Sequence, residues 1–295
     1  MSVTPPVVLT IAGFDPSSGA GITADIKTIA AHECYGVACI TALTIQSTQG
    51  VRRVVGVDAK IVAETLAELV ADLAVEAVHI GMLGNAQVVA VVADFLGDFT
   101  GQTSPGKVRL PHVVLDPILK SSSGTDLLDA AGTRLLIERL IPLAQVVTPN
   151  LDEASALTGM EVRNLDQMRA AAARLHTMGA ANVVVTGGHL EKATDLLSFT
   201  TVRGIEREVF KADRQRPNAT HGTGCAFSTA LACHLAHGRG LPEAVMLSKA
   251  YVSAAIVNAY ALGKGVGPLH HLYRMGQQRR ASTVVTETEH ARSRN

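Results

Sequence analysis

The chain has 295 residues, of which 47% are hydrophobic and 18% are charged, and its formal net charge is zero. This apolar content excludes an intrinsically disordered chain, and the zero net charge gives no attraction to nucleic acid or to an anionic membrane. The N-terminal residues lack the basic and apolar regions of a secretory signal, and no apolar run is long enough to span a bilayer, so we expect a cytoplasmic protein.

Short β-branched runs alternate along the chain with Ala- and Leu-rich stretches of helical spacing. Strand, helix, strand and helix are predicted in turn over residues 7–12, 22–32, 37–44 and 58–72, the last with Asp58 as its N-cap. The same order continues over residues 77–80, 86–96, 112–116 and 130–140, with a surface loop over 102–106. A strand over residues 145–148 then precedes helices over 151–157 and 165–178.

The last part of the chain adds an antiparallel element to this pattern. A strand over residues 182–186 is followed by residues 195–200 and 205–211, whose alternating polarity predicts a hairpin, and by helices over 222–237 and 241–262. This order predicts an α/β fold with a doubly wound, mostly parallel sheet. No linker divides the chain, so we predict one domain over residues 1–275 and a polar tail over residues 276–295 that we expect to be disordered.

The clearest local motif is THGTGC at residues 220–225, which runs into an Ala-rich helix. Gly222 and Gly224 let the backbone approach a ligand closely, and the first N–H groups of a helix have no intrahelical partners. Together with the helix dipole, these groups form an anion site that could stabilise a transferring phosphoryl group. The alternative interpretation is a glycine-rich helix cap.

Cys225 falls in the first turn of that predicted helix, where the dipole is expected to lower the pKa of its thiol. Such a thiol could act as a general base toward a substrate hydroxyl, although a free cysteine is more often a small buried residue. Cys34, Cys39 and Cys233 are interpreted as structural, reduced thiols, because no pair of cysteines has CxxC spacing.

Four further loops follow predicted strands, at the edge where ligands bind in folds of this kind. The loop GFDPSSGAG at residues 13–21 matches neither a dinucleotide fingerprint nor a P-loop, so it indicates a tight loop over a small substrate or a structural turn. Asp116, Asn150 and Glu153 could organise Mg²⁺ through water, or simply cap helices. TGGH at residues 186–189 could meet a nucleotide or form a glycine turn.

Taken together, the motifs resemble one family. TIAGFDPSSGAGITADIKT, ITALTIQSTQGV, HIGMLG, VVLDP, TPNLDEA, TGGHLE, THGTGCAFSTALA and GKGVGPLHH occur in the order found in the bifunctional hydroxymethylpyrimidine kinase/phosphomethylpyrimidine kinases of thiamine biosynthesis, in the ribokinase superfamily. The resemblance covers residues 7–272. It implies a three-layer fold with helices on both faces of the sheet, a homodimer, ATP with Mg²⁺ as donor, and 4-amino-5-hydroxymethyl-2-methylpyrimidine and its monophosphate as acceptors.

The resemblance also implies roles for residues that match the family's motifs. Those expected to line the pyrimidine are Gly13, Ala20, Gln46 and Met82. Those expected near the reacting groups are Asp25, the anion-hole residues Gly222, Thr223 and Gly224, and Cys225 as the base. Those expected at Mg²⁺ and the nucleotide are Asp116, Asn150, Glu153, Thr186, Gly188 and Thr223.

The chain departs from the family pattern at a few positions. Thr186 stands where the family often has lysine, so a positive charge near the nucleotide is lost unless Lys120 or another residue replaces it. Ala219 stands where the family has asparagine, and ILKSSSG at residues 118–124 replaces the usual MVxKSG.

Two other functions fit parts of the pattern. A pyridoxal/pyridoxine kinase would bind a similar flat hydroxymethyl heterocycle, and Gln46 and Met82 favour the pyrimidine without deciding the matter. A non-catalytic pyrimidine-binding sensor is disfavoured by the intact Asp116, Glu153 and THGTGC motif.

Overall fold

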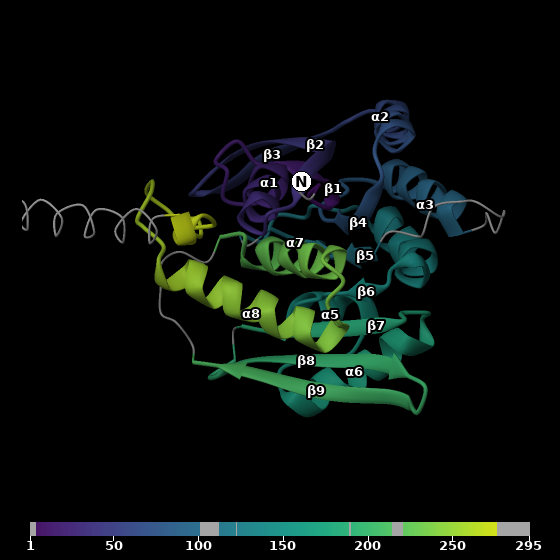
Figure 1. The fold of residues 1–295 in the computed structure, drawn as a ribbon, viewed down its shortest axis with the longest axis vertical. Helices are drawn as coiled ribbons and strands as arrows, with labels where there is room; N and C mark the ends of the chain where they lie inside the picture. The colour runs from purple at the N-terminus through teal and green to yellow at the C-terminus, as the bar shows by residue number, and fades with distance from the viewer. Residues whose placement is uncertain (1–3, 101–111, 122, 189, 214–220, 276–295) are drawn as a thin grey trace, which may run out of the picture.

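The computed structural model describes residues 4–100, 112–121, 123–188, 190–213 and 221–275 (Figure 1). The predicted loop over 102–106, the predicted tail over 276–295 and the departure at Ala219 lie outside these residues.

In the described residues, nine strands form one sheet in the order β3-β2-β1-β4-β5-β6-β7-β8-β9. Their bounds are Val7–Phe14 for β1, Tyr35–Ser47 for β2, Gly50–Gly56 for β3, Val75–Ile80 for β4, His112–Leu115 for β5, Val146–Val147 for β6, Asn182–Gly187 for β7, Ala193–Thr201 for β8 and Gly204–Ala212 for β9. The strands from β2 to β7 in this order pair in parallel, whereas β3, β8 and β9 join their neighbours antiparallel. The mostly parallel sheet and the terminal hairpin are therefore confirmed.

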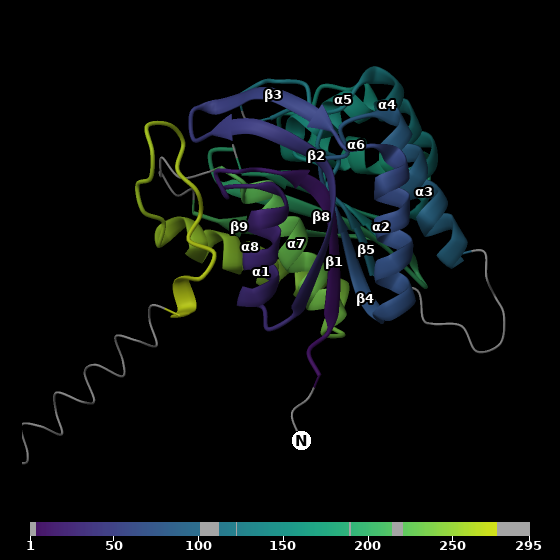
Figure 2. The ribbon, with the colours of Figure 1, turned by 90° about the horizontal axis from the view of Figure 1, so that it is seen from above.

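Helices cover both faces of this sheet. Their bounds are Gly21–Ala31 for α1, Ala59–Asp72 for α2, Ala86–Thr100 for α3, Ala130–Leu135 for α4, Leu151–Thr158 for α5, Leu165–Thr177 for α6, Thr223–Ala236 for α7 and Leu241–Val257 for α8. Figure 2 shows α1, α7 and α8 on one side of the sheet and α2 and α3 on the other. None of the helices in the described part of the chain combines the length and the apolarity that crossing a bilayer requires.

The alternation of side chains along each strand explains the three layers. Val8 on β1 packs into the core beneath α1, α7 and α8, whereas its neighbour Leu9 packs into the core beneath α2 to α6. Val114 and Leu115 on β5 divide in the same way. Because successive side chains of a strand point to opposite faces, continuous apolar runs are needed wherever both faces are covered.

Three elements differ clearly from the prediction. The last helix, predicted over residues 241–262, ends at Val257. The strand β3 was missed, because its sequence GVRRVVG is short, contains two arginines and is largely exposed. The helix predicted over residues 130–140 is α-helical only to Leu135, and it continues as a π turn over Leu136–Leu140 and a 3₁₀ turn over Ile141–Leu143. Pro142 lies in that last turn and cannot extend an α-helical hydrogen-bond ladder.

The predicted N-cap of α2 is confirmed, since the Asp58 side chain accepts a hydrogen bond from the Lys60 N–H at 2.8 Å. Asp58→Ala should therefore lower the free energy of unfolding by about 1 kcal/mol, measured by urea denaturation. Asp72→Ala makes the same substitution at the other end of α2, where no N–H group is free, and should not destabilise the protein. Equal destabilisation by both variants would contradict the capping role.

Candidate active site

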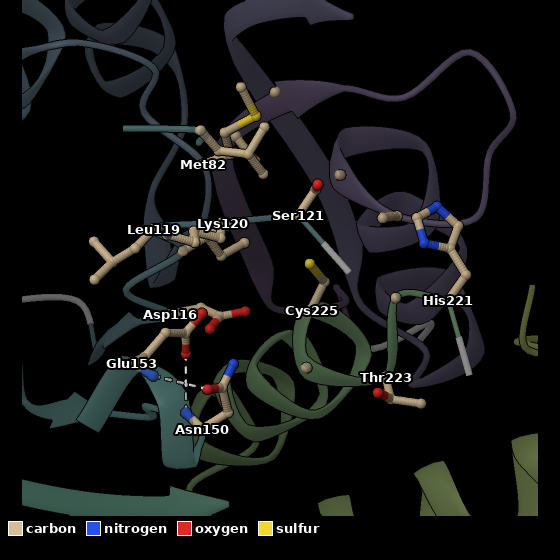
Figure 3. A pocket seen from close by; sticks show the side chains of 18 of the residues that line it. Met82, Asp116, Leu119, Lys120, Ser121, Asn150, Glu153, His221, Thr223 and Cys225 are labelled. Carbon is tan, nitrogen blue, oxygen red and sulfur yellow. Dashed lines mark hydrogen bonds between the residues drawn. The ribbon is translucent and has the colours of Figure 1, made fainter. Parts of the chain in front are cut away.

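A cavity of about 790 Å³ opens at the carboxyl edge of the parallel strands (Figure 3). Gln46 on β2, Asp116 after β5, Thr148 after β6 and Thr186 on β7 all line it, although they are far apart in the sequence. The loop between β1 and α1 and the start of α7 also line the cavity. The structure thus brings together the strand-end motifs that the sequence pointed to, at the edge where such folds bind ligands.

The start of α7 is built on a glycine that no other residue could replace without strain. Gly222 is the N-cap, with φ of 81°, and a Cβ at this position would collide with the Gly19 carbonyl oxygen. The helix therefore begins in close contact with the loop after β1. Residues Gly222, Thr223, Gly224 and Cys225 all line the cavity, and the first N–H groups of a helix have no intrahelical partners, so the start of α7 offers donors of the kind that can bind an anion.

Cys225 occupies the first turn of α7 as predicted, but the expected lowering of its pKa is wrong. Burial raises the pKa of the thiol well above its usual value, and the charges of Asp116 and Asp25 raise it further. The prediction considered the helix dipole and nearby donors, and left out burial and the carboxylates that other elements bring close. In the protein alone, Cys225 is therefore a protonated thiol beside Asp116.

Two buried carboxyl groups, Asp116 and Glu153, form the acidic part of the cavity. Burial raises the pKa of Asp116 to about 7, and burial together with the Asp116 charge raises the pKa of Glu153 well above its usual value. Asp116 Oδ2 is buried without a hydrogen-bond partner. Two mutually repelling carboxylates, one with an unpartnered oxygen, suit a divalent cation.

Asn150 and Glu153 also form a capping box at the start of α5 (Figure 3). Asn150 Oδ1 accepts from the Glu153 N–H, and Glu153 Oε2 accepts from the Asn150 N–H, both at 2.9 Å. The capping interpretation of these residues is therefore correct. In the described residues no group of three or more His, Cys, Asp or Glu side chains is placed to hold a metal ion, so a Mg²⁺ here would take most of its ligands from water and phosphate oxygens.

Comparison with known proteins decides the family. The sequence matches the phosphomethylpyrimidine kinase family over residues 15–270. The chain belongs to this family. A hydroxymethylpyrimidine/phosphomethylpyrimidine kinase of Streptomyces coelicolor is 39% identical over 276 residues, which cover 93% of this chain and 97% of that protein.

Two other relatives extend the comparison. The thiamine biosynthesis bifunctional protein ThiED of Geobacter sulfurreducens is 41% identical over 267 residues, covering 90% of this chain. The chain spans about half the length of ThiED, since the match covers 52% of that protein. The solved structure of an ADP complex of Bacillus subtilis pyridoxal kinase has a TM-score of 0.80 at 33% identity, covering 92% of this chain and 100% of that one. The predicted family and the predicted ribokinase-like fold are thus confirmed.

The raised pKa of Asp116 predicts a pH-dependent stability of the kinase. The folded form holds this proton up to about pH 7, whereas the unfolded chain releases it near pH 3.8, so the fold loses stability as the pH rises through that window. Asp116→Asn removes the buried charge and should raise the free energy of unfolding at about pH 8, by on the order of 2 kcal/mol.

Urea denaturation of Asp116→Asn and wild type from about pH 5 to about pH 8 measures this effect, because the advantage of the variant should grow with pH. Asp94→Asn is a matched control, since Asp94 is exposed and pairs with Arg139 on the surface. A variant that is less stable than wild type at every pH would contradict the predicted strain at Asp116.

The four residues expected at the pyrimidine all line the cavity of the kinase: Gly13, Ala20, Gln46 and Met82. A Cβ on Gly13 would lie 2.8 Å from Met82 Sδ, so a larger residue at this position would displace the end of the Met82 side chain. Gln46 lies beside Thr44 and His221, whose contacts are described below.

Asp25 is placed differently from the expectation. It does not line the cavity; it lies fully buried in α1, where it accepts hydrogen bonds from Thr10 Oγ1 at 2.7 Å and Thr229 Oγ1 at 2.9 Å. His79 Nδ1 is 3.5 Å from Asp25 Oδ2. Burial alone would lower the pKa of His79, but the Asp25 and Asp116 charges raise it. One sequence signal could have pointed to this buried group, namely a histidine within the otherwise apolar end of β4.

The residues expected at the nucleotide divide. Thr186 and Thr223 line the cavity, whereas Gly188 is exposed and does not. Lys120, the lysine considered above as a replacement for the missing charge at Thr186, also lines the cavity. Its Nζ lies 3.2 Å from Asp126 Oδ1. Lys249 on α8, which no sequence pattern pointed to, does not line the cavity but lies near Thr186: its Nζ is 2.6 Å from Asp195 Oδ2, and Asp195 pairs with Thr186 across β7 and β8.

Proposed function

We propose that this protein transfers a phosphoryl group from ATP to 4-amino-5-hydroxymethyl-2-methylpyrimidine and then a second one to the resulting monophosphate, as in thiamine biosynthesis. The single observation that carries the proposal is the shared cavity, in which Gln46 and Met82 face the same space as the anion-binding start of α7. A kinase needs an acceptor pocket beside phosphoryl-binding donors, since positioning and charge stabilisation supply most of its rate enhancement.

In the first step the substrate hydroxyl oxygen attacks the γ-phosphorus, the bond to the β-phosphate oxygen breaks and ADP leaves. The N–H groups at Thr223, Gly224 and Cys225 would bind the oxygens of the transferring group. Cys225 would first release its own proton to water and would then, as a thiolate, accept the hydroxyl proton. A Mg²⁺ held at Asp116 and Glu153 would neutralise these carboxylates, and so remove part of the repulsion that raises the pKa of the thiol.

In the second step the nucleophile is an oxygen of the substrate phosphate, which is already anionic. It has no proton that must be removed before attack, so no base is needed in this step.

Thr186 and Thr223 are proposed to contact the nucleotide, and Gly188 is proposed to contact it through its backbone. Asn150 is proposed to hold Glu153 in place through the capping box. Asp25 is proposed to act from beneath the cavity, by setting the charge around Cys225.

The test is release of ADP with three acceptors assayed in parallel: hydroxymethylpyrimidine, its monophosphate and pyridoxal. We expect turnover with both pyrimidines and a lower kcat/KM with pyridoxal. Turnover with pyridoxal alone would replace the proposal by the second candidate, pyridoxal kinase, which the high TM-score to the Bacillus subtilis enzyme favours. No ADP release with any acceptor would favour a pyrimidine-binding sensor.

We further propose that residues 1–275 form one domain and that the protein is a cytoplasmic homodimer. Leu43, Ile45 and Val55 each leave between 45% and 48% of their surface exposed, and Leu43 pairs directly with Val55 across β2 and β3. These apolar side chains would be covered in a dimer. The four cysteines are free thiols, as a reducing compartment requires.

A further inference from the structure

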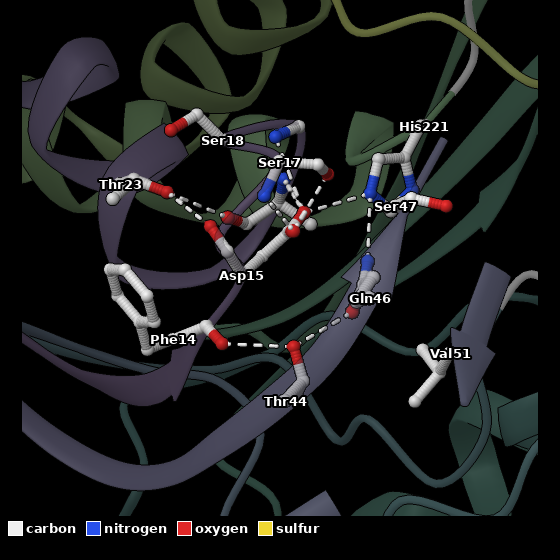
Figure 4. A network of polar contacts seen from close by, with 12 residues as sticks. Phe14, Asp15, Ser17, Ser18, Thr23, Thr44, Gln46, Ser47, Val51 and His221 are labelled. Carbon is white, nitrogen blue, oxygen red and sulfur yellow. Dashed lines mark hydrogen bonds and ion pairs between the residues drawn. The ribbon is translucent and has the colours of Figure 1, made fainter. Parts of the chain in front are cut away.

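Asp15 organises the loop between β1 and α1 (Figure 4). Its Oδ1 accepts from the N–H and the hydroxyl of Ser17, and its Oδ2 accepts from the N–H groups of Gly19 and Ala20. Burial alone would raise the pKa of Asp15, but the hydrogen bonds from His221 and Ser17 hold it below its usual value. Asp15 is therefore an ionised carboxylate that can only accept hydrogen bonds.

This carboxylate fixes the position of a proton on His221. His221 Nε2 lies 3.0 Å from Asp15 Oδ2, so Nε2 must carry a hydrogen to donate. Gln46 Nε2 lies 3.1 Å from the same His221 nitrogen. Two N–H groups that face each other cannot form a hydrogen bond, so the amide end of Gln46 that meets His221 has to be its oxygen.

The other end of the same amide leads independently to the same conclusion. Thr44 Oγ1 lies 3.0 Å from the Phe14 carbonyl oxygen and 3.2 Å from Gln46 Oε1, yet a hydroxyl has only one hydrogen to donate. A half-turn of the Gln46 amide, whose two ends have the same shape, resolves both conflicts. Gln46 Oε1 then shares the one Nε2 hydrogen of His221 with Asp15 Oδ2 in a three-centre hydrogen bond, Gln46 Nε2 donates to Thr44 Oγ1, and Thr44 donates to the Phe14 carbonyl oxygen.

We infer that His221, oriented by Asp15, holds the Gln46 amide in one orientation and is thereby a positioning residue that determines substrate specificity. The inference rests on the proposed function for the identity of the substrate. In this arrangement His221 uses one lone pair of the Gln46 oxygen and Thr44 uses one N–H of its nitrogen. Gln46 lines the cavity, so its second lone pair and its second N–H are left for a substrate.

Fixing the amide gives the kinase a way to read the ring edge. An aminopyrimidine edge presents an NH₂ donor beside a ring-nitrogen acceptor, whereas the corresponding 4-oxo compound presents a C=O acceptor beside a ring N–H donor. A freely turning glutamine fits either pattern by rotating its amide. A glutamine held by its neighbours fits one pattern and leaves unpaired polar groups with the other, which is how a site rejects an analogue strongly.

The test is the ratio of kcat/KM for hydroxymethylpyrimidine to that for its 4-oxo analogue. In His221→Ala the amide is free to turn, so the ratio should fall at least about 10-fold from its wild-type value. In His221→Gln, which keeps an N–H donor, the ratio should stay close to that of wild type. Thr44→Val removes the acceptor at the other end of the amide and should lower the ratio in the same direction, so the test does not depend on one variant. A proportional loss on both substrates, with the ratio unchanged, would mean that His221 only supports the structure.

A second readout needs no substrate. Nitrogen-15 NMR of the wild-type protein should show His221 Nε2 bonded to hydrogen. A bare Nε2 with the hydrogen on Nδ1 would overturn the inference whatever acceptors the enzyme uses. A protonated Nε2 in an enzyme that fails to phosphorylate either pyrimidine would leave the amide arrangement standing and refute the proposed function instead.

Discussion

Replacing Cys225 with alanine should lower the rate of alcohol phosphorylation by about 10²–10⁴-fold, the usual contribution of a general base. The same variant should phosphorylate the monophosphate at a rate close to that of wild type, because a phosphate oxygen already carries the charge that the base would create. Rapid-mixing measurements of ADP release with each acceptor would give the two rates separately. The difference between the two losses matters more than either loss, since it separates proton transfer from packing.

Cys233→Ala supplies the matched control. Cys233 lies on the same helix, is fully buried and does not line the cavity, so its replacement removes a thiol of the same size away from the chemistry. Both steps should keep wild-type rates in this variant. Equal losses in the two steps for Cys225→Ala would contradict its role as a base and would indicate that the thiol positions the phosphoryl group or packs the start of α7.

Gly222→Ala should slow both steps together, by about 10²–10³-fold, the loss typical of removing a donor to a developing charge. The backbone at this position is left-handed, a conformation that strains any residue with a side chain, and a Cβ would also collide with the Gly19 carbonyl oxygen. The first turn of α7 would then move away from the loop after β1. Because its N–H groups are proposed to bind the transferring group in both reactions, the rates of both steps should fall.

Gly238→Ala separates the collision from the backbone strain. Gly238 follows the other end of α7 with a similar φ of 77°, but a Cβ there meets nothing within 4 Å. This variant should lose some stability and keep its kinetics. If Gly222→Ala also kept wild-type rates in both steps, the close approach of α7 to the loop would have no part in phosphoryl transfer.

Apolar runs made most of the fold predictable. β1, β4, β5 and β7 are buried on both faces over most of their length, so each contains a short, mainly apolar run that stands out against the helices. β3 gave no such signal, because a strand at the edge of a sheet with exposed side chains has no need of an apolar pattern. Its pairing depends on β2 continuing to Ser47, three residues beyond the predicted end.

The candidate site was predictable where a motif carries its own geometry. Glycines before a helix and polar residues after strands place Gly222 and Asp116 at the cavity without knowledge of the rest of the fold. Properties that arise between distant segments were not predictable in this way. The pKa of Cys225 is raised by burial and by carboxylates on other elements, and the contact between Asp15 and His221 joins residues 206 positions apart in the chain.

Phosphorus-31 NMR of one reaction containing hydroxymethylpyrimidine, the purified protein, Mg²⁺ and excess ATP tests most directly whether one cavity performs both phosphorylations. We predict that a phosphomonoester signal appears first and is then replaced by the signals of a pyrimidine diphosphate, with two ADP formed for each pyrimidine consumed. A reaction that stops at the monoester, with one ADP per pyrimidine, would contradict the claim that one cavity performs both phosphorylations.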